Sequence, residues 1–122
     1  MPLKIGVVGS CAAGKTTLAN GMKRFGYDVR HIAQEHSYVP AMWQRVSNPD
    51  CLIYLHVSYP NTLIRRKMNW SEQEYQEQLR RLQHARDHAD LAIDTDPLTP
   101  EQVLQIALEF VTNISPNSAQ QK

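Results

Sequence analysis

A glycine-containing loop between a predicted strand and a predicted helix constrains the fold of this 122-residue chain more than any other feature. Residues 9–16 fit the pattern G-x-x-x-x-G-K-[ST]. The run before the loop, residues 3–8, is short, apolar and rich in β-branched side chains, which predicts a buried strand. The run after it places Leu18, Met22 and Phe25 on one face of a predicted helix. A strand, a glycine loop and a helix in this order are typical of a site for a nucleoside triphosphate.

Each residue type in the loop is suited to binding phosphate. Gly9 and Gly14 permit backbone angles and a close approach that a Cβ atom would prevent. Backbone N–H groups of the loop can then point at an anion, next to the positive end of the helix. Lys15 supplies a point charge for the β- and γ-phosphates, and the Thr16 hydroxyl is a ligand for Mg²⁺, which prefers hard oxygen atoms. The loop residues predicted to bind the nucleotide are Gly9, Ser10, Cys11, Ala12, Ala13, Gly14, Lys15, Thr16 and Thr17.

The composition is that of a single globular domain. Hydrophobic residues make up 42% of the chain and charged residues 20%, which are ordinary values. The net charge of +1 gives no reason to expect nucleic acid as a partner. No apolar run is long enough to span a membrane and no secretory leader precedes the first strand, so we expect a cytoplasmic protein without a membrane partner. We expect one nucleotide-binding domain over residues 1–114 and a disordered polar tail over residues 115–122.

The rest of the chain alternates predicted strands and helices. Three further strands are predicted, at residues 27–33 from the alternation of apolar and polar residues and at residues 51–57 and 91–95 from apolar runs. Residues 34–39 are predicted as a polar loop after the first of these strands. Four further helices are predicted from periodicity and capping signals, at residues 40–46, 62–68, 71–88 and from 99 onward. The helix over residues 71–88 begins with a capping box of Ser71 and Glu74, and its apolar stripe is predicted to be Tyr75, Leu79 and Leu82. The residues predicted to line the last helix are Val103, Ala107, Phe110 and Val111. This order predicts an α/β fold, a three-layer α/β/α sandwich around a parallel sheet of about four strands. Ligands bind at the carboxyl edge of such sheets, where the glycine loop also lies.

Phosphoryl transfer needs a carboxylate that orients the waters of Mg²⁺ or accepts a proton from the acceptor hydroxyl. Glu35 is the candidate, because it follows the predicted strand over residues 27–33 and should lie at the same edge as the glycine loop. The alternative is a solvated loop carboxylate. Asp94 and Asp96 are second candidates for the catalytic acid.

Several segments together resemble P-loop nucleoside, nucleotide and shikimate-type kinases. They are the Walker loop and residues 49–58, 65–67 and 89–96, and the resemblance covers nearly all of the chain before the tail. It implies the P-loop NTPase fold. It also implies that Arg65 and Arg66 belong to a lid, in which an arginine stabilises the charge that develops on the transferring phosphate. The alternative for these cations is a solvated helix end that complements the helix dipole.

The resemblance further implies a place for the nucleobase, with Asp96 and Pro97 in a wall of the adenine site. The chain departs from the kinase pattern in three ways. His56 replaces the acid that commonly ends the strand resembling residues 51–57. The usual acidic Walker B strand is missing, and so is the insertion that binds the phosphoryl acceptor.

From these residues we expect a protein that binds ATP with Mg²⁺ and transfers the γ-phosphoryl group to a small metabolite or nucleoside-like acceptor. GTP is disfavoured because the chain contains no N-K-x-D guanine motif. The alternative is a regulatory or structural nucleotide-binding module with little or no turnover. A homo-oligomer could supply the missing part of the site.

Overall fold

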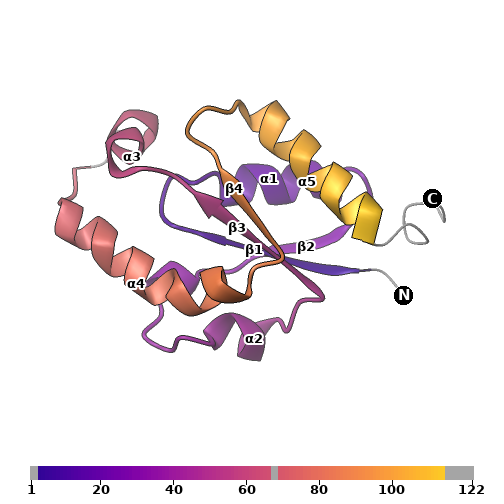
Figure 1. Cartoon of the computed structure of the whole chain (residues 1–122), viewed down its shortest axis with the longest axis horizontal. Helices are drawn as coiled ribbons and strands as arrows, with labels where there is room; N and C mark the ends of the chain where they lie inside the picture. The colour runs from indigo at the N-terminus through magenta and orange to yellow at the C-terminus, as the bar shows by residue number, and fades with distance from the viewer. Residues whose placement is uncertain (1–2, 67–68, 115–122) are drawn as a thin grey trace.

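The computed structural model describes residues 3–66 and 69–114, which form an α/β fold around a four-stranded parallel sheet (Figure 1). The strands are β1 Lys4–Gly9, β2 Asp28–His31, β3 Cys51–His56 and β4 Leu91–Asp94. Their order in the sheet is β2-β1-β3-β4, so β1 and β3 are central. The predicted parallel sheet is confirmed. The predicted disordered tail lies outside the described residues, and so does Lys67 of the basic segment.

The described residues also form five α-helices and one short 3₁₀ helix. They are α1 Lys15–Lys23, the 3₁₀ helix η1 Gln34–His36, α2 Met42–Val46, α3 Tyr59–Arg66, α4 Glu72–His88 and α5 Pro100–Ile114. The predicted capping box of α4 is present, because Ser71 Oγ accepts from the Glu74 N–H and Glu74 Oε1 accepts from the Ser71 N–H. Thr99 and Gln102 make the same reciprocal pair of bonds at the start of α5.

Helices pack against both faces of the sheet, which is compatible with a three-layer arrangement (Figure 1). Alternate side chains of a strand point to opposite faces, so β3 contributes to two cores. The first core joins Ile53 of β3 to α1 and α5, through residues such as Met22 and Ala107. The second core joins Tyr54 of β3 to α2 and α4, through residues such as Leu82. No helix within the described ranges is long and apolar enough to cross a membrane.

Two details of the predicted helices are wrong. Phe25 was expected on the buried face of the first helix, but α1 ends at Lys23 and Phe25 is 52% exposed. The chain leaves the helix there through Gly26, whose φ of +89° is a left-handed conformation that favours glycine. On α4, Leu79 was expected in the apolar stripe and is only half-buried, whereas the polar Gln78 beside it is buried.

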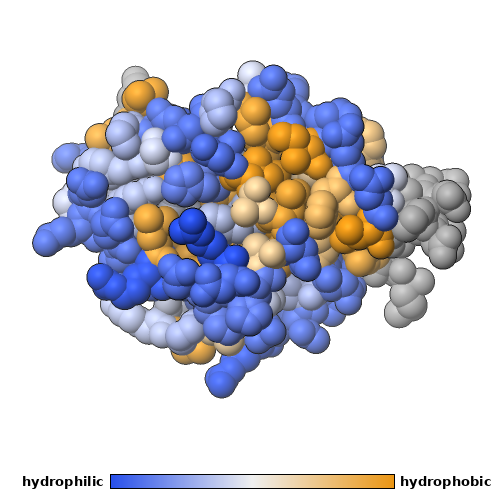
Figure 2. Space-filling model, viewed as in Figure 1, coloured by the Kyte–Doolittle hydropathy of each residue, from blue (hydrophilic) through white to orange (hydrophobic). Residues whose placement is uncertain are grey.

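The surface seen in Figure 2 is unevenly polar. Hydrophobic residues gather beside β4 and α5, and the side formed by α3 and α4 is mostly hydrophilic. The partly buried apolar residues on the first side include Leu91, Leu98, Leu104 and Leu108. The hydrophilic side adjoins the carboxyl edge of the sheet, where the glycine loop lies.

Candidate functional site

The glycine loop connects the end of β1 to the start of α1. A Cβ atom at Gly9 would lie 2.6 Å from the carbonyl oxygen of Leu55 on β3, so the loop leaves the sheet at a point where a side chain does not fit. Gly14 has a φ of +95° and precedes α1, where only glycine adopts the backbone angle without strain. Ala12 also has a positive φ, of 69°. The loop therefore bends sharply back over the start of α1.

In the described part of the chain, no side chain caps the N–H groups in the first turn of α1. Gly14 offers no side-chain cap, and the first turn contains no acidic residue. Thr16 and Thr17 are exposed there. Because the first N–H groups of a helix need partners and carry its positive dipole end, this terminus is suited to an anion. Thr16, the residue predicted to bind Mg²⁺, is exposed in this turn.

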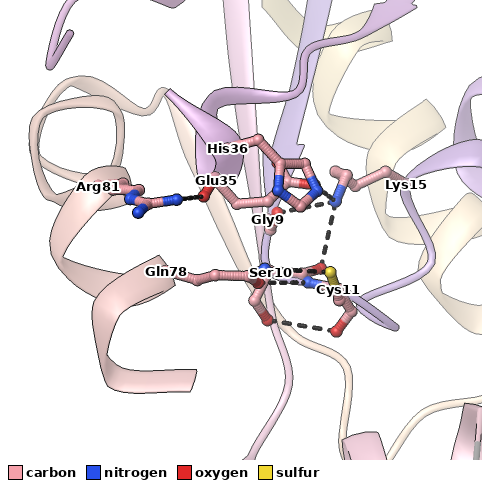
Figure 3. Close-up of polar contacts among 8 residues, drawn as sticks. All are labelled: Gly9, Ser10, Cys11, Lys15, Glu35, His36, Gln78 and Arg81. Atoms are coloured by element: carbon pink, nitrogen blue, oxygen red, sulfur yellow. Dashed lines mark hydrogen bonds and ion pairs between the residues drawn. The ribbon is translucent and has the colours of Figure 1, made fainter. Parts of the chain in front are cut away.

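Lys15 forms an ion pair with Glu35, and the structure thus brings these two predicted site residues together (Figure 3). Lys15 Nζ lies 2.7 Å from Glu35 Oε2, and it also donates to the carbonyl oxygens of Gly9 at 2.8 Å and Ser10 at 3.2 Å. The two side chains are only 10% and 5% exposed. The alternative of a solvated loop carboxylate is therefore excluded. Glu35 Oε1 is buried and has no hydrogen-bond partner among the described residues.

The burial of Glu35 follows from the way that η1 is fixed to its neighbours. Gln34 is fully buried, and its amide oxygen accepts from the Trp43 N–H at 2.9 Å. The amide nitrogen donates to the carbonyl oxygens of Val39 at 2.9 Å and Arg81 at 3.2 Å. The Arg81 guanidinium in turn donates to the carbonyl oxygen of Glu35 at 3.3 Å. Residues 34–39 were predicted as a polar loop, but these bonds fix residues 34–36 as a helical turn between α2 and α4.

Gln78 is a site residue that the sequence interpretation missed. Its amide oxygen accepts from the Cys11 N–H at 3.0 Å, and its amide nitrogen donates to Cys11 Sγ at 3.1 Å (Figure 3). A signal was present, because Gln78 lies three residues after Tyr75 and four before Leu82 and so falls on the buried stripe of α4. A glutamine at such a position needs polar partners, and the loop supplies them.

Arg65 and Arg66 both approach the glycine loop, but on different sides of it. The Arg65 guanidinium donates to the carbonyl oxygen of Ala12 at 3.1 Å. It also donates to the hydroxyl oxygen of Thr95 at 3.0 Å and to the carbonyl oxygen of Thr95 at 2.7 Å. It lines a cavity of about 460 Å³ together with Ala13 and Leu98. Arg66 lines a second cavity of about 380 Å³ with Lys15 and Thr16. The loop residues Ala12, Gly14 and Thr17 border both cavities.

Asp96 is bound to the start of α3. Its Oδ1 accepts from the N–H of Ser58 at 3.0 Å. Burial raises the pKa of Asp96, but hydrogen bonds from Ser58 and Asn61 and the nearby His56 lower it, and the net pKa lies below its usual value. The residues of this segment that line the larger cavity are Thr95, Leu98 and Pro100, whereas Asp96 and Pro97 are not among its lining residues.

Asp94, the other second candidate, is exposed at the end of β4 and accepts from the Asp96 N–H at 3.2 Å. At the end of β3, the residue beside Asp94 in the parallel register is His56. Among the described acids, Glu35 is therefore the one that contacts the loop lysine.

The comparisons with protein-family models and with curated proteins give no match for this chain. The chemistry of the site therefore rests on the residues and distances described above.

Proposed function

We propose that this chain is a P-loop nucleotide-binding protein that binds ATP with Mg²⁺ and transfers the γ-phosphoryl group to a small hydroxylated or phosphorylated metabolite. The observation that carries the proposal is the uncapped amino end of α1, with Lys15 beside it and exposed threonines in its first turn. Such a terminus is a binding site for phosphate groups. The parallel sheet with helices on both faces supports the P-loop fold.

In this proposal Lys15 exchanges partners when the nucleotide binds. Without a ligand its ammonium group is neutralised by Glu35 and two carbonyl oxygens. Phosphate oxygens carry more negative charge than those carbonyl oxygens. A phosphate bound by the N–H groups of the loop would therefore attract the ammonium group away from the carbonyl oxygens. Mg²⁺, when bound by the Thr16 hydroxyl and phosphate oxygens, would neutralise part of the phosphate charge. Glu35, released from Lys15, would then be available as the proton acceptor for the attacking hydroxyl.

The larger cavity is our candidate for the nucleobase. Its volume of about 460 Å³ lies in the range of small-molecule sites. Leu18, Leu98 and Val103 give it apolar walls, and the guanidinium of Arg65 gives it a planar cation. The predicted adenine wall at Asp96 and Pro97 stays a prediction.

The smaller cavity is our candidate for the transferring phosphate. Arg66 lines it together with Lys15 and Thr16. A guanidinium at that position would stabilise negative charge that develops between the donor and acceptor oxygens. We therefore propose separate roles for the two arginines of α3, with Arg65 toward the base and Arg66 toward the phosphates.

The alternative function, a nucleotide-binding module with little or no turnover, is favoured by one observation. The two central strands end at the glycine loop and at His56, so neither provides a carboxylate at this edge, and Glu35 is tied to Lys15. In that case the nucleotide would be a structural or regulatory ligand. A second copy of the chain could also complete the acceptor site.

Calorimetric titration of ATP, ADP and GTP in the presence of Mg²⁺ tests the binding step. We expect ATP to bind to the wild-type chain. Lys15→Ala should lower the affinity for ATP at least about tenfold, because a charge-assisted contact to phosphate is lost. Lys23→Ala is the matched control, since Lys23 is an exposed lysine at the other end of α1. If the wild-type chain binds none of the three nucleotides at millimolar concentration, the proposal is wrong.

The release of ADP in the presence of a panel of nucleosides and metabolites distinguishes the kinase from the module. For a kinase we expect Glu35→Gln to lower turnover by about 100-fold or more, the contribution of a general base. The same variant should bind ATP at least as tightly as the wild type, because Lys15 loses its anionic partner. Glu101→Gln, at an exposed acid of α5, is the control. Unchanged turnover in Glu35→Gln would remove this residue from the mechanism.

A further inference from the structure

Three metal-ligating side chains of different chemistry meet beside the glycine loop. One ligand atom from each of Cys11, Glu35 and His36 lies within 4.8 Å of the other two. Figure 3 shows the Glu35 and His36 side chains and the Cys11 sulfur on the same side of the loop, near Lys15. We propose that, in the chain without nucleotide, Cys11, Glu35 and His36 bind a transition-metal ion of the Zn²⁺ type, at a site distinct from that proposed for Mg²⁺ at Thr16. Because a metal-bound carboxylate cannot accept a proton, metal binding and the proposed role of Glu35 as a base exclude each other.

The ligand set selects the class of metal. A thiolate, an imidazole nitrogen and a carboxylate oxygen are the three ligand types that Zn²⁺ takes in proteins. Mg²⁺ prefers an octahedron of hard oxygen ligands and has no affinity for thiolate sulfur comparable to that of Zn²⁺ or Co²⁺. Three protein ligands leave the fourth tetrahedral position open to water or another small ligand.

Two independent features support a metal ion at this cluster: the hydrogen bonds that orient Cys11, and a buried oxygen of Glu35 without a partner among the described residues. Gln78 holds Cys11 through both its backbone N–H and its sulfur, and the hydrogen bond to Sγ orients the sulfur atom. The Glu35 side chain is 5% exposed, and its Oε1 has no hydrogen-bond partner in the described part of the chain. A buried carboxylate oxygen without a partner costs free energy, and a bound cation would offset that cost.

His36 gives the site an entrance and the freedom to close. Its side chain is 60% exposed, and its Nε2 lies 3.7 Å from Glu35 Oε2. Metal–ligand bonds of about 2.0 to 2.3 Å in a tetrahedron place the donor atoms about 3.3 to 3.7 Å apart. The His36–Glu35 pair is already at the upper end of this range, and no two of the three ligand atoms lie more than 4.8 Å apart, so the cluster needs to contract by at most about 1.5 Å. The exposed imidazole can rotate to take part in that movement.

Lys15 opposes the metal by its charge, but it has other partners. Its ammonium group shares Glu35 Oε2, and it also donates to the carbonyl oxygens of Gly9 and Ser10. These two acceptors remain when the carboxylate turns toward a metal. The site therefore does not require an unpaired lysine.

Titration of the full chain with Co²⁺, without nucleotide, tests the proposal directly. We expect visible absorption bands of tetrahedral Co²⁺ together with a thiolate-to-cobalt charge-transfer band, and we expect Zn²⁺ to remove both by displacement. Mg²⁺ should not displace the cobalt. Absence of the charge-transfer band would overturn the proposal and would leave the proposed ATP site untouched, because that site is tested with nucleotide and Mg²⁺.

Two variants locate the metal. Cys11→Ser should abolish the charge-transfer band and lower Co²⁺ affinity at least about tenfold, and His36→Gln should lower the affinity similarly while the thiolate band persists. His36 is exposed, so its replacement leaves the core unchanged. His88→Gln is the control, because His84 and His88 stack at 4.2 Å on α4 and are a competing histidine pair. Loss of cobalt binding in His88→Gln, or unchanged affinity in both site variants, would contradict the proposed site.

Discussion

The two faces of the sheet bury different kinds of side chain. Between the sheet and helices α1 and α5, the buried cluster is apolar, with Ile53 of β3 and Met22 of α1 among its members. Between the sheet and helices α2 and α4, apolar residues share the interior with Gln34, Glu35 and Gln78. The first face is stabilised mainly by apolar packing, whereas on the second face each buried polar group needs a specific partner.

The difference follows the position of the candidate site. The buried amides on the α4 side fix η1 and the glycine loop, as Gln34 binds the backbone of Trp43 and Arg81 and Gln78 binds Cys11. Polar groups inside a protein add little net stability when they are satisfied and cost much when they are not. We infer that this face is built to position Glu35 and Cys11 rather than to maximise stability, and the predictions below compare the two faces.

The largest effect is expected from a cavity in the apolar face. Ile53→Ala removes a fully buried side chain that packs against α1 and α5, and it should lower the free energy of unfolding by about 2–5 kcal/mol. Equilibrium unfolding in urea measures the change. Ile64→Ala is the matched control, since Ile64 is 73% exposed, and it should change stability by less than about 0.5 kcal/mol. Equal effects in the two variants would contradict the proposed core.

A smaller loss is expected when an amide in the polar face is replaced by an apolar side chain of similar size. Gln34→Leu gains hydrophobicity but leaves the Trp43 N–H and the carbonyl oxygens of Val39 and Arg81 without their partner. The free energy of unfolding should fall by about 1–3 kcal/mol, measured by the same urea titration. Gln76→Leu, at an exposed glutamine of α4, is the control. If Gln34→Leu were stabilising, the amide would not be needed to fix η1.

The same contrast explains how much of the molecule the sequence predicts. On the α1–α5 face, apolar residues recur at helical spacing, so Leu18, Met22, Val103 and Ala107 are correctly predicted as buried. Ser71 predicts the start of α4 for a similar reason, because a capping box is a local signal. Strand order is not local, and the order β2-β1-β3-β4 becomes known only from the structure.

The polar face is less predictable because its residue types are those of a surface. Glutamine and glutamate are mostly exposed in proteins, so residue type alone assigns Gln34 and Gln78 to solvent, although helical spacing places Gln78 on the buried stripe of α4. Their burial depends on partners far along the chain, such as Cys11 for Gln78 and Arg81 for Gln34. The place of Glu35 at the carboxyl edge could be predicted from topology, but its burial and its contact with Lys15 could not.

The last comparison concerns alkaline pH, with no effect expected at neutral pH, because on each side of the sheet burial raises the pKa of at least one group that titrates only above pH 9. Burial raises the pKa of Cys51, in the apolar cluster, from 9.0 to about 12, with nearby Asp90 and Asp50 adding to the shift. Burial also raises the pKa of Tyr75 on α4 from 10.0 to about 12. The Tyr75 hydroxyl donates to the carbonyl oxygen of Val57 at 2.6 Å.

Both groups give up a proton more easily in the unfolded chain, so their contribution to stability is complete below about pH 9 and is lost as the pH rises toward 12. Urea unfolding at a series of pH values should therefore show that the free energy of unfolding falls as the pH rises. The contribution of Cys51 should begin to fall at about pH 9, and that of Tyr75 at about pH 10. Cys51→Ala should flatten the decline from its beginning, whereas Tyr75→Phe should flatten only its later part. A wild-type stability that stays constant between pH 9 and 12 would show that neither group is protected from solvent as the structure requires.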